Sequence, residues 1–98
     1  MNELDEKRKA NLEINRAALA EQVISNSIYQ EAIGMMEADC YSAFESSKQS
    51  DSKKHDQVWL QLNAIKAFRS NLEYIMENGA YAKQTLTALE RVKKTIGL

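Results

Sequence analysis

Apolar residues recur at intervals of three and four along most of this 98-residue chain, the spacing that places side chains on one face of an α-helix. No stretch alternates β-branched and polar residues, so strands are not expected. The pattern predicts an all-α fold, either a helical hairpin or a small bundle of three to four helices. The expected helices belong to a single domain, residues 1–98, and span residues 1–24, 27–47, 52–77 and 80–96.

The third segment has the strongest periodicity, with apolar residues on one stripe for about six turns. Asn78 and Gly79 have the chemistry of a helix end, yet the register of apolar residues continues through them. A continuous helix and a hairpin both fit, and the pattern favours a break or kink at Gly79. The second and third segments should form the core, with Leu62, Ile65, Phe68 and Leu72 packing against Ile33, Met36, Cys40 and Phe44.

The remaining segments are less apolar. The stripe of the first one (Leu12, Leu19, Val23) is thin, which predicts either an arm that docks on a partner or a frayed end. Ser27 followed by Gln30 has the spacing of a capping box at the start of the second helix. Gly34 within that helix indicates a close approach of another helix. Residues 46–54 form a polar loop, in which Asp51 or Ser52 is a good N-cap for the third helix.

Composition narrows the class of protein. The 13 basic and 14 acidic residues give a net charge of −1, so nothing attracts the whole chain to nucleic acid or to an anionic membrane. Counting along the sequence gives nine acids and five bases in residues 1–50 (−4), then five acids and eight bases in residues 51–98 (+3). This asymmetry suggests complementarity between halves or between copies. The start of the chain is acidic and no apolar run could span a membrane, so a cytoplasmic protein is expected.

Candidate catalytic chemistry is sparse. His55 is the one histidine, and its place beside charged residues at a helix start favours a solvated side chain. Cys40 is the one cysteine and lies on an apolar stripe, where a thiol behaves as a small hydrophobic group. The chain has no glycine-rich phosphate loop, nucleophile elbow or metal-binding cysteine pair. We therefore expect no enzymatic activity, no metal and no cofactor.

Binding residues can be nominated by type. Aromatic and large apolar side chains dominate protein interfaces, and the candidates here are Trp59, Tyr74, Tyr81, Leu86 and Leu89. For Trp59, a core role is as well supported as an interface role. The candidates for contacts with an anion or with nucleic acid are Lys53, Lys54, Arg91, Lys93 and Lys94. A structural role explains these cations more simply, since positive charge near a helix C-terminus complements the helix dipole.

One family resemblance rests on two stretches, EAIGMMEADCYSAFESS and QVWLQLNAIKAFRSNLEYIMENGAYAKQTLTALE, separated by a polar spacer. Over residues 28–90 the chain resembles short helical proteins encoded among the head and DNA-packaging genes of tailed bacteriophages. The shared features are an acidic helix, the spacer, a Trp-Leu start and a long helix with Met-Glu-Asn-Gly near its end. The resemblance implies a role in assembly or packaging in the bacterial host cytoplasm or the virion, and supplies no catalytic residues.

Three functions follow as hypotheses. The first is a homo-oligomeric interaction protein of phage head assembly or DNA packaging, since a chain this short buries its apolar stripes poorly on its own. The second is a DNA-binding packaging component resembling a small terminase subunit, for which the +3 second half is the support. The third is an inhibitor that binds a host protein.

Overall fold

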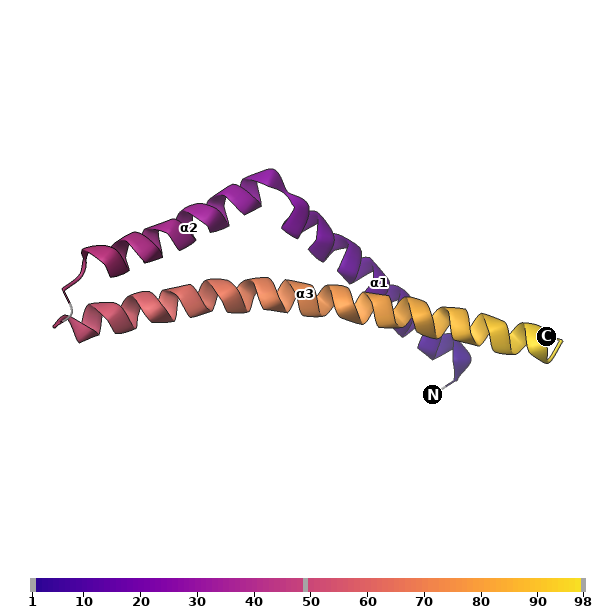
Figure 1. Cartoon of the computed structure of the whole chain (residues 1–98). Helices are drawn as coiled ribbons and strands as arrows, with labels where there is room; N and C mark the ends of the chain where they lie inside the picture. Colours follow the sequence, from indigo (N-terminus) through magenta and orange to yellow (C-terminus); the bar gives the residue numbers. More distant parts are fainter. Residues whose placement is uncertain (1, 49, 98) are drawn as a thin grey trace. The chain divides into compact units, whose positions relative to one another are not determined.

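The computed structural model describes residues 2–48 and 50–97, which form three α-helices (Figure 1). These are α1 (Glu3–Ser25), α2 (Ser27–Ser46) and α3 (Ser52–Thr95). The described residues contain no strand, and the predicted all-α class is confirmed. The chain divides into two compact units: unit 1 comprises Met1–Gln22 and Leu72–Leu98, and unit 2 comprises Val23–Asn71.

Each unit packs only two helical segments together. Unit 1 pairs α1 with the C-terminal part of α3, and unit 2 pairs α2 with the N-terminal part of α3. A helical hairpin is therefore a correct description of unit 2. The alternative prediction, a bundle of three to four helices around one core, is wrong, because each unit has its own small set of buried residues.

The start of α2 differs from its prediction. Asn26 is the N-cap, and its Oδ1 accepts hydrogen bonds from two backbone N–H groups of the first turn at 2.9 and 3.0 Å. The predicted capping box of Ser27 and Gln30 is therefore wrong. The Gln30 side chain instead donates a hydrogen bond to the Ile24 carbonyl at 3.0 Å. Asparagine thus satisfies orphan amides of the first turn, the kind of role that was predicted for Ser27.

At the other end of the polar loop, Asp51 caps α3 as predicted. Its Oδ1 accepts a hydrogen bond from the backbone N–H of Lys54 at 3.2 Å. The helix then runs without interruption to Thr95, about 66 Å at 1.5 Å per residue. Beyond its end, Gly97 has a φ of +77°, the left-handed conformation that glycine tolerates best.

Gly79 lies inside α3, so the predicted break between residues 77 and 80 is wrong. A Cβ atom at Gly79 would overlap the methyl group of Ala17 in α1 and lie 3.2 Å from the Glu13 carbonyl oxygen. The missing side chain thus allows α1 and α3 to approach closely within unit 1. Gly34 has nothing within 4 Å of its Cβ position, so the close approach predicted there is also wrong.

The core of unit 2 largely matches the prediction. Ile33 and Cys40 of α2 are buried against Leu62 and Ile65 of α3, together with Val58. Three further side chains pack on this cluster: Tyr29, Ala43 and Phe44. Three expected core residues are not in it: Leu72 belongs to unit 1, and Met36 and Phe68 are each 51% exposed. A single partner helix covers only part of a wide apolar face, and these two residues lie beyond that part.

Small residues form the contact in unit 1. Ala10 and Ala20 of α1 and Ala82 of α3 are its buried hydrophobic residues. The segments run antiparallel, since Gly79 faces Ala17 and Lys93 pairs with the first residue of α1. The frayed end considered for this segment is therefore wrong. Its apolar stripe does not reach the contact, because Leu12, Leu19 and Val23 are all exposed.

Candidate interaction surfaces

An apolar groove of about 590 Å³ opens between the two helices of unit 2. Residues of α2 and α3 line it in equal number: Ile33, Met36, Asp39 and Cys40 from α2, and Gln61, Ala64, Ile65 and Phe68 from α3. Ile33, Cys40 and Ile65 form its floor, since they are buried. The half-exposed Met36 and Phe68 line it from opposite helices. The groove is an uncovered extension of the unit 2 core.

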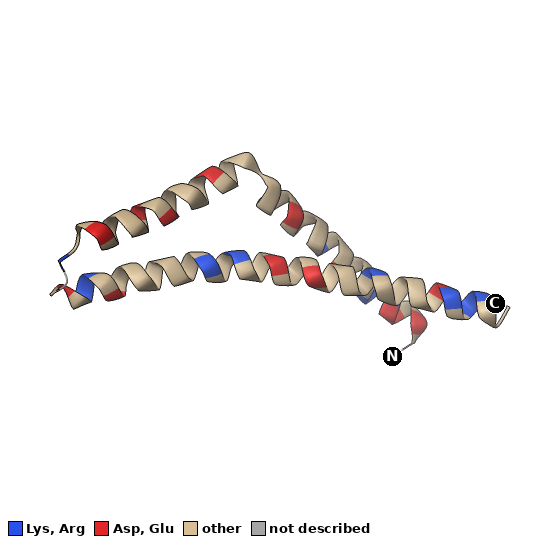
Figure 2. Ribbon diagram, viewed as in Figure 1, with Lys and Arg blue, Asp and Glu red and all other residues tan. Residues whose placement is uncertain are grey.

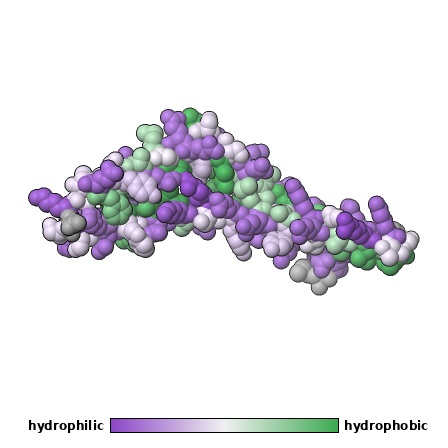
Figure 3. All heavy atoms as spheres, in the orientation of Figure 1, coloured by the Kyte–Doolittle hydropathy of each residue, from purple (hydrophilic) through white to green (hydrophobic). Residues whose placement is uncertain are grey.

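The apolar surface continues along both helices beside this groove. In α2, Ile28 and Met35 are exposed and lie on the helical face that carries Asp39, at positions i, i+7 and i+11. In α3, the exposed Leu60 stands one turn before Ala64, which itself precedes Phe68 by one turn. On the face drawn in Figure 3, apolar (green) side chains reach the surface of unit 2 among polar ones.

Charge is distributed unequally between the two helices of unit 2 (Figure 2). Helix α2 has no lysine or arginine and four acidic residues, which are Glu31, Glu37, Asp39 and Glu45. The first part of α3, residues 52–71, has one acidic residue, Asp56, and four basic ones, which are Lys53, Lys54, Lys66 and Arg69. Glu37 and Arg69 form an ion pair, with Oε1 and Nη2 2.5 Å apart. The other three carboxylates of α2 have no ion pair within the part of the chain that is described.

The five predicted interface residues fall into two groups. Trp59 in unit 2 and Tyr74 and Tyr81 in unit 1 are exposed by 60–68%, as interface anchors without a bound partner are expected to be. Leu86 and Leu89 are half-buried in unit 1. Trp59 and the tyrosines belong to different units, so the five residues are not described as one surface.

The predicted anion-binding residues are also divided between the units. Lys53 and Lys54 lie in unit 2 and are exposed. In unit 1, Arg91 and Lys94 are exposed, whereas Lys93 is half-buried. No single basic surface can therefore be described from these five residues.

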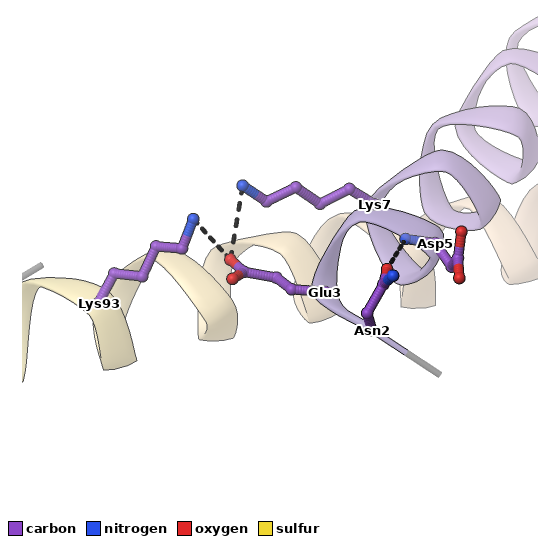
Figure 4. Close-up of polar contacts among 5 residues, drawn as sticks. All are labelled: Asn2, Glu3, Asp5, Lys7 and Lys93. Atoms are coloured by element: carbon purple, nitrogen blue, oxygen red, sulfur yellow. Dashed lines mark hydrogen bonds and ion pairs between the residues drawn. The ribbon is translucent and has the colours of Figure 1, made fainter.

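Lys93 already has a partner within unit 1. Its Nζ lies 2.5 Å from Oε1 of Glu3, and Nζ of Lys7 lies 3.5 Å from the same oxygen (Figure 4). The hydrogen bond from Lys93 lowers the pKa of Glu3 below its ordinary value of 4.5. Reciprocally, the carboxylate of Glu3 raises the pKa of Lys93 above 10.5. This cation holds the start of α1 against the end of α3, a structural use that its sequence position does not reveal.

The two residues with reactive side chains both lie in the core region of unit 2. Cys40 is 5% exposed and forms part of the buried cluster. His55 was predicted to be solvated, but its ring is half-buried and lies 5.7 Å from the ring of Phe44. Tyr29 packs against Phe68 at 6.1 Å, and its hydroxyl is buried without a hydrogen-bond partner in the described structure.

Two kinds of structural feature are absent from residues 2–48 and 50–97. No group of three or more His, Cys, Asp and Glu side chains is placed to hold a metal ion. None of the described helices combines the length and the apolar character that crossing a bilayer requires.

The groove itself was missed by sequence reasoning, which assigned five of its eight lining residues (Ile33, Met36, Cys40, Ile65 and Phe68) to a closed core. A signal was present in α2, where Ile28 and Met35 fall outside the stripe that contains Ile33 and Cys40. Apolar residues on a second face of a helix indicate a second packing partner.

Comparison of the chain with protein-family models, curated proteins and solved structures gave no match. The resemblance to helical proteins of the phage head and packaging region therefore stays a prediction.

Proposed function

We propose that this chain is a non-enzymatic interaction protein that associates with further copies of itself. The observation that carries the proposal is the ratio of exposed to buried apolar side chains. Fifteen large hydrophobic residues are at least 39% exposed among the described residues. Eight hydrophobic residues of the described part are buried, three of them alanines, and no large side chain there is fully buried.

This distribution is unfavourable for an isolated protomer. Complete burial of one large apolar side chain contributes about 1.5–3 kcal/mol, so a core built from four such residues, Cys40 and three alanines gives little stability. Small domains obtain the stability that their cores do not supply from bound metals, disulfides or association. Cys40 is the one cysteine and no metal-binding group is found among the described residues, which leaves association as the source of additional burial.

The biological setting that we propose is head assembly or DNA packaging in a tailed bacteriophage. It rests on the resemblance carried by the acidic helix, the polar spacer and the long helix over residues 28–90. Assembly factors act by binding other proteins, and apolar surface on a small helical protein suits that task.

Light scattering coupled to size exclusion tests the self-association. We expect a mass of twice 11.1 kDa or a higher multiple at micromolar concentration, with a melting temperature that rises with protein concentration. A monomer of 11.1 kDa whose melting temperature does not depend on concentration would contradict the proposal.

A DNA-binding packaging component is the second candidate, because four cations nominated from the sequence (Lys53, Lys54, Arg91 and Lys94) are exposed. Their separation into two units and the pairing of Lys93 with Glu3 give it less support. Binding that depends on several phosphate contacts falls steeply with salt. A gel shift of duplex DNA at about 50 mM salt that disappears at about 200 mM supports this candidate, and no shift at the lower salt excludes it.

A further inference from the structure

We infer that the groove of unit 2 is the dimer interface, and that it is covered by the same groove of a second copy of this chain. This inference rests on the proposed self-association and assigns it to one surface. In the dimer, two hairpins of α2 and the N-terminal part of α3 pack face to face as four helices. The acidic α2 of each copy lies along the basic part of α3 of the other.

The first argument is the composition of the groove. Six of its eight lining residues are apolar, and the two polar ones are Asp39 and Gln61. Its buried floor belongs to the core of unit 2, and half-exposed side chains, Met36 and Phe68, rise from opposite helices. A second apolar face placed on this groove would enclose Met36 and Phe68 and turn two shallow clusters into one continuous core.

The second argument is area. Helix α2 has 20 residues and is therefore about 30 Å long. Two helices packed about 8–10 Å apart present a face about 20 Å wide, so the projected area is about 600 Å². The accessible area of a face ridged by side chains exceeds its projection, which brings it close to the ~800 Å² per partner of a stable interface. A second copy also covers both grooves with a single contact, as two-fold symmetric interfaces do.

The third argument is charge, and it fixes the arrangement of the copies. Unit 2 is antiparallel, because Tyr29 meets Phe68 while Phe44 meets His55 near the loop. Two such hairpins can pack with α2 on α2 or with α2 on α3. The first arrangement opposes two helices that each carry four acids and no base. Apart from the Glu37–Arg69 pair within each hairpin, the second opposes three acids to a segment with three bases and one acid, so like-charge repulsion selects it.

With α2 against the partner's α3, the two-fold axis runs along the helices and both polar loops lie at the same end. The aromatic contacts within one hairpin place residue 29 level with residue 68, and residue 44 level with residue 55. Two residues at the same height on α2 and α3 therefore have numbers that add up to between 97 and 99. A two-fold axis along the helices keeps each residue at its height, so the same rule holds between copies. Ala32 of one copy, whose number adds to that of Ala64 to give 96, then lies close to the height of Ala64 of the other. Both alanines are exposed and lie on the face that contains the groove.

Phe68→Asp in the full-length chain tests the location of the interface. Placing a charge in a buried contact should raise the dissociation constant of the dimer by about 30-fold or more, measured by sedimentation. Tyr41→Asp is the matched control, since Tyr41 is 50% exposed on α2 but does not line the groove, and it should leave the dissociation constant within about threefold. Leu60→Asp repeats the test at an exposed site, with circular dichroism verifying that both variants stay helical.

Disulfide formation tests the arrangement. Oxidation of a mixture of Ala32→Cys and Ala64→Cys chains should give a 32–64 link between copies, since a disulfide needs Cα atoms about 4.4–6.8 Å apart. Peptide mapping identifies the link and distinguishes it from any bond to the buried Cys40. A 32–32 link as the main product overturns the arrangement.

The outcomes separate the inference from the function on which it rests. A dimer that withstands Phe68→Asp and Leu60→Asp but dissociates with Leu19→Asp places the interface on α1 and overturns the groove assignment alone. Capture of a phage or host protein by the groove of a monomeric chain overturns the choice of a second copy. A wild-type monomer overturns both the inference and the proposed self-association.

Discussion

Units 1 and 2 share one helix, α3, yet they pack its two parts in different ways. In unit 2, bulky residues such as Ile33, Leu62 and Ile65 fill the space between the helices. In unit 1, alanines and Gly79 occupy the contact, and leucines of α1 point away from it. Small residues permit a close approach of two backbones but remove little apolar surface from water. Helical periodicity alone therefore does not reveal which kind of contact a stripe will make.

The largest expected effect concerns the bulky core of unit 2. Leu62→Ala removes a side chain that is 7% exposed, and the lost burial plus the cavity should lower the free energy of unfolding by about 2–4 kcal/mol. Chemical denaturation at a fixed protomer concentration measures it. Leu12→Ala is the control, because the same truncation at a side chain 61% exposed should cost under about 1 kcal/mol. Equal losses of unfolding free energy would mean that Leu12 is as well buried in the folded protein as Leu62.

Two glycine-to-alanine substitutions, one in each unit, test the difference in how closely their helices approach. Gly79→Ala places a methyl group onto that of Ala17, and such overpacking should destabilise the fold by about 1–3 kcal/mol, reduced by the better helix propensity of alanine. Gly34→Ala is the matched change in unit 2, where the space is open, and should stabilise it by about 0.5–1 kcal/mol. Thermal melts of both variants measure the difference in sign. If Gly79→Ala is as stabilising as Gly34→Ala, α1 and α3 are not in close contact.

The smallest expected effect is the pH dependence of the ion pair in unit 1. Because the hydrogen bond from Lys93 lowers the pKa of Glu3, its stabilisation is complete above pH 4.5 and is lost as the carboxylate is protonated below that value. The raised pKa of Lys93 places the corresponding loss in base above pH 10.5. Exposed ion pairs contribute little to the free energy of unfolding, so an NMR titration of the Glu3 carboxyl is the better measurement. In Lys93→Gln its pKa should return toward 4.5, and an unchanged pKa would contradict the pairing.

Much of the helical structure could be predicted from the sequence because periodicity and capping are local. The spacing of Ile33, Cys40, Leu62 and Ile65 identified the core of unit 2, and Asp51 was correctly expected at the start of α3. Gly79 was misread because the chemistry that ends a helix also permits a close neighbour, and the neighbour, Ala17, lies 62 residues earlier (79 minus 17). Sequence alone does not reveal contacts between such distant segments.

The candidate surfaces were less accessible to sequence reasoning than the helices. Met36 and Phe68 satisfy the pattern of a core, and only the number of helices packed together determines whether they are covered. Lys93 was a candidate for anion binding that the helix dipole explained more simply, and neither interpretation anticipated its ion pair with Glu3. In both cases the missing information was the partner segment rather than the residue type.

Because Cys40 is buried between α2 and α3, the reactivity of its thiol reports how often the hairpin of unit 2 opens. As the one thiol of the sequence, and 5% exposed on the floor of the groove, it should react with an aromatic disulfide reagent more slowly while α2 is packed on α3 than when the two helices separate. The rate of that reaction follows the opening of the hairpin, without a label or a substitution. Oxidants meet the same barrier, so burial in the hairpin should lengthen the lifetime of the reduced thiol.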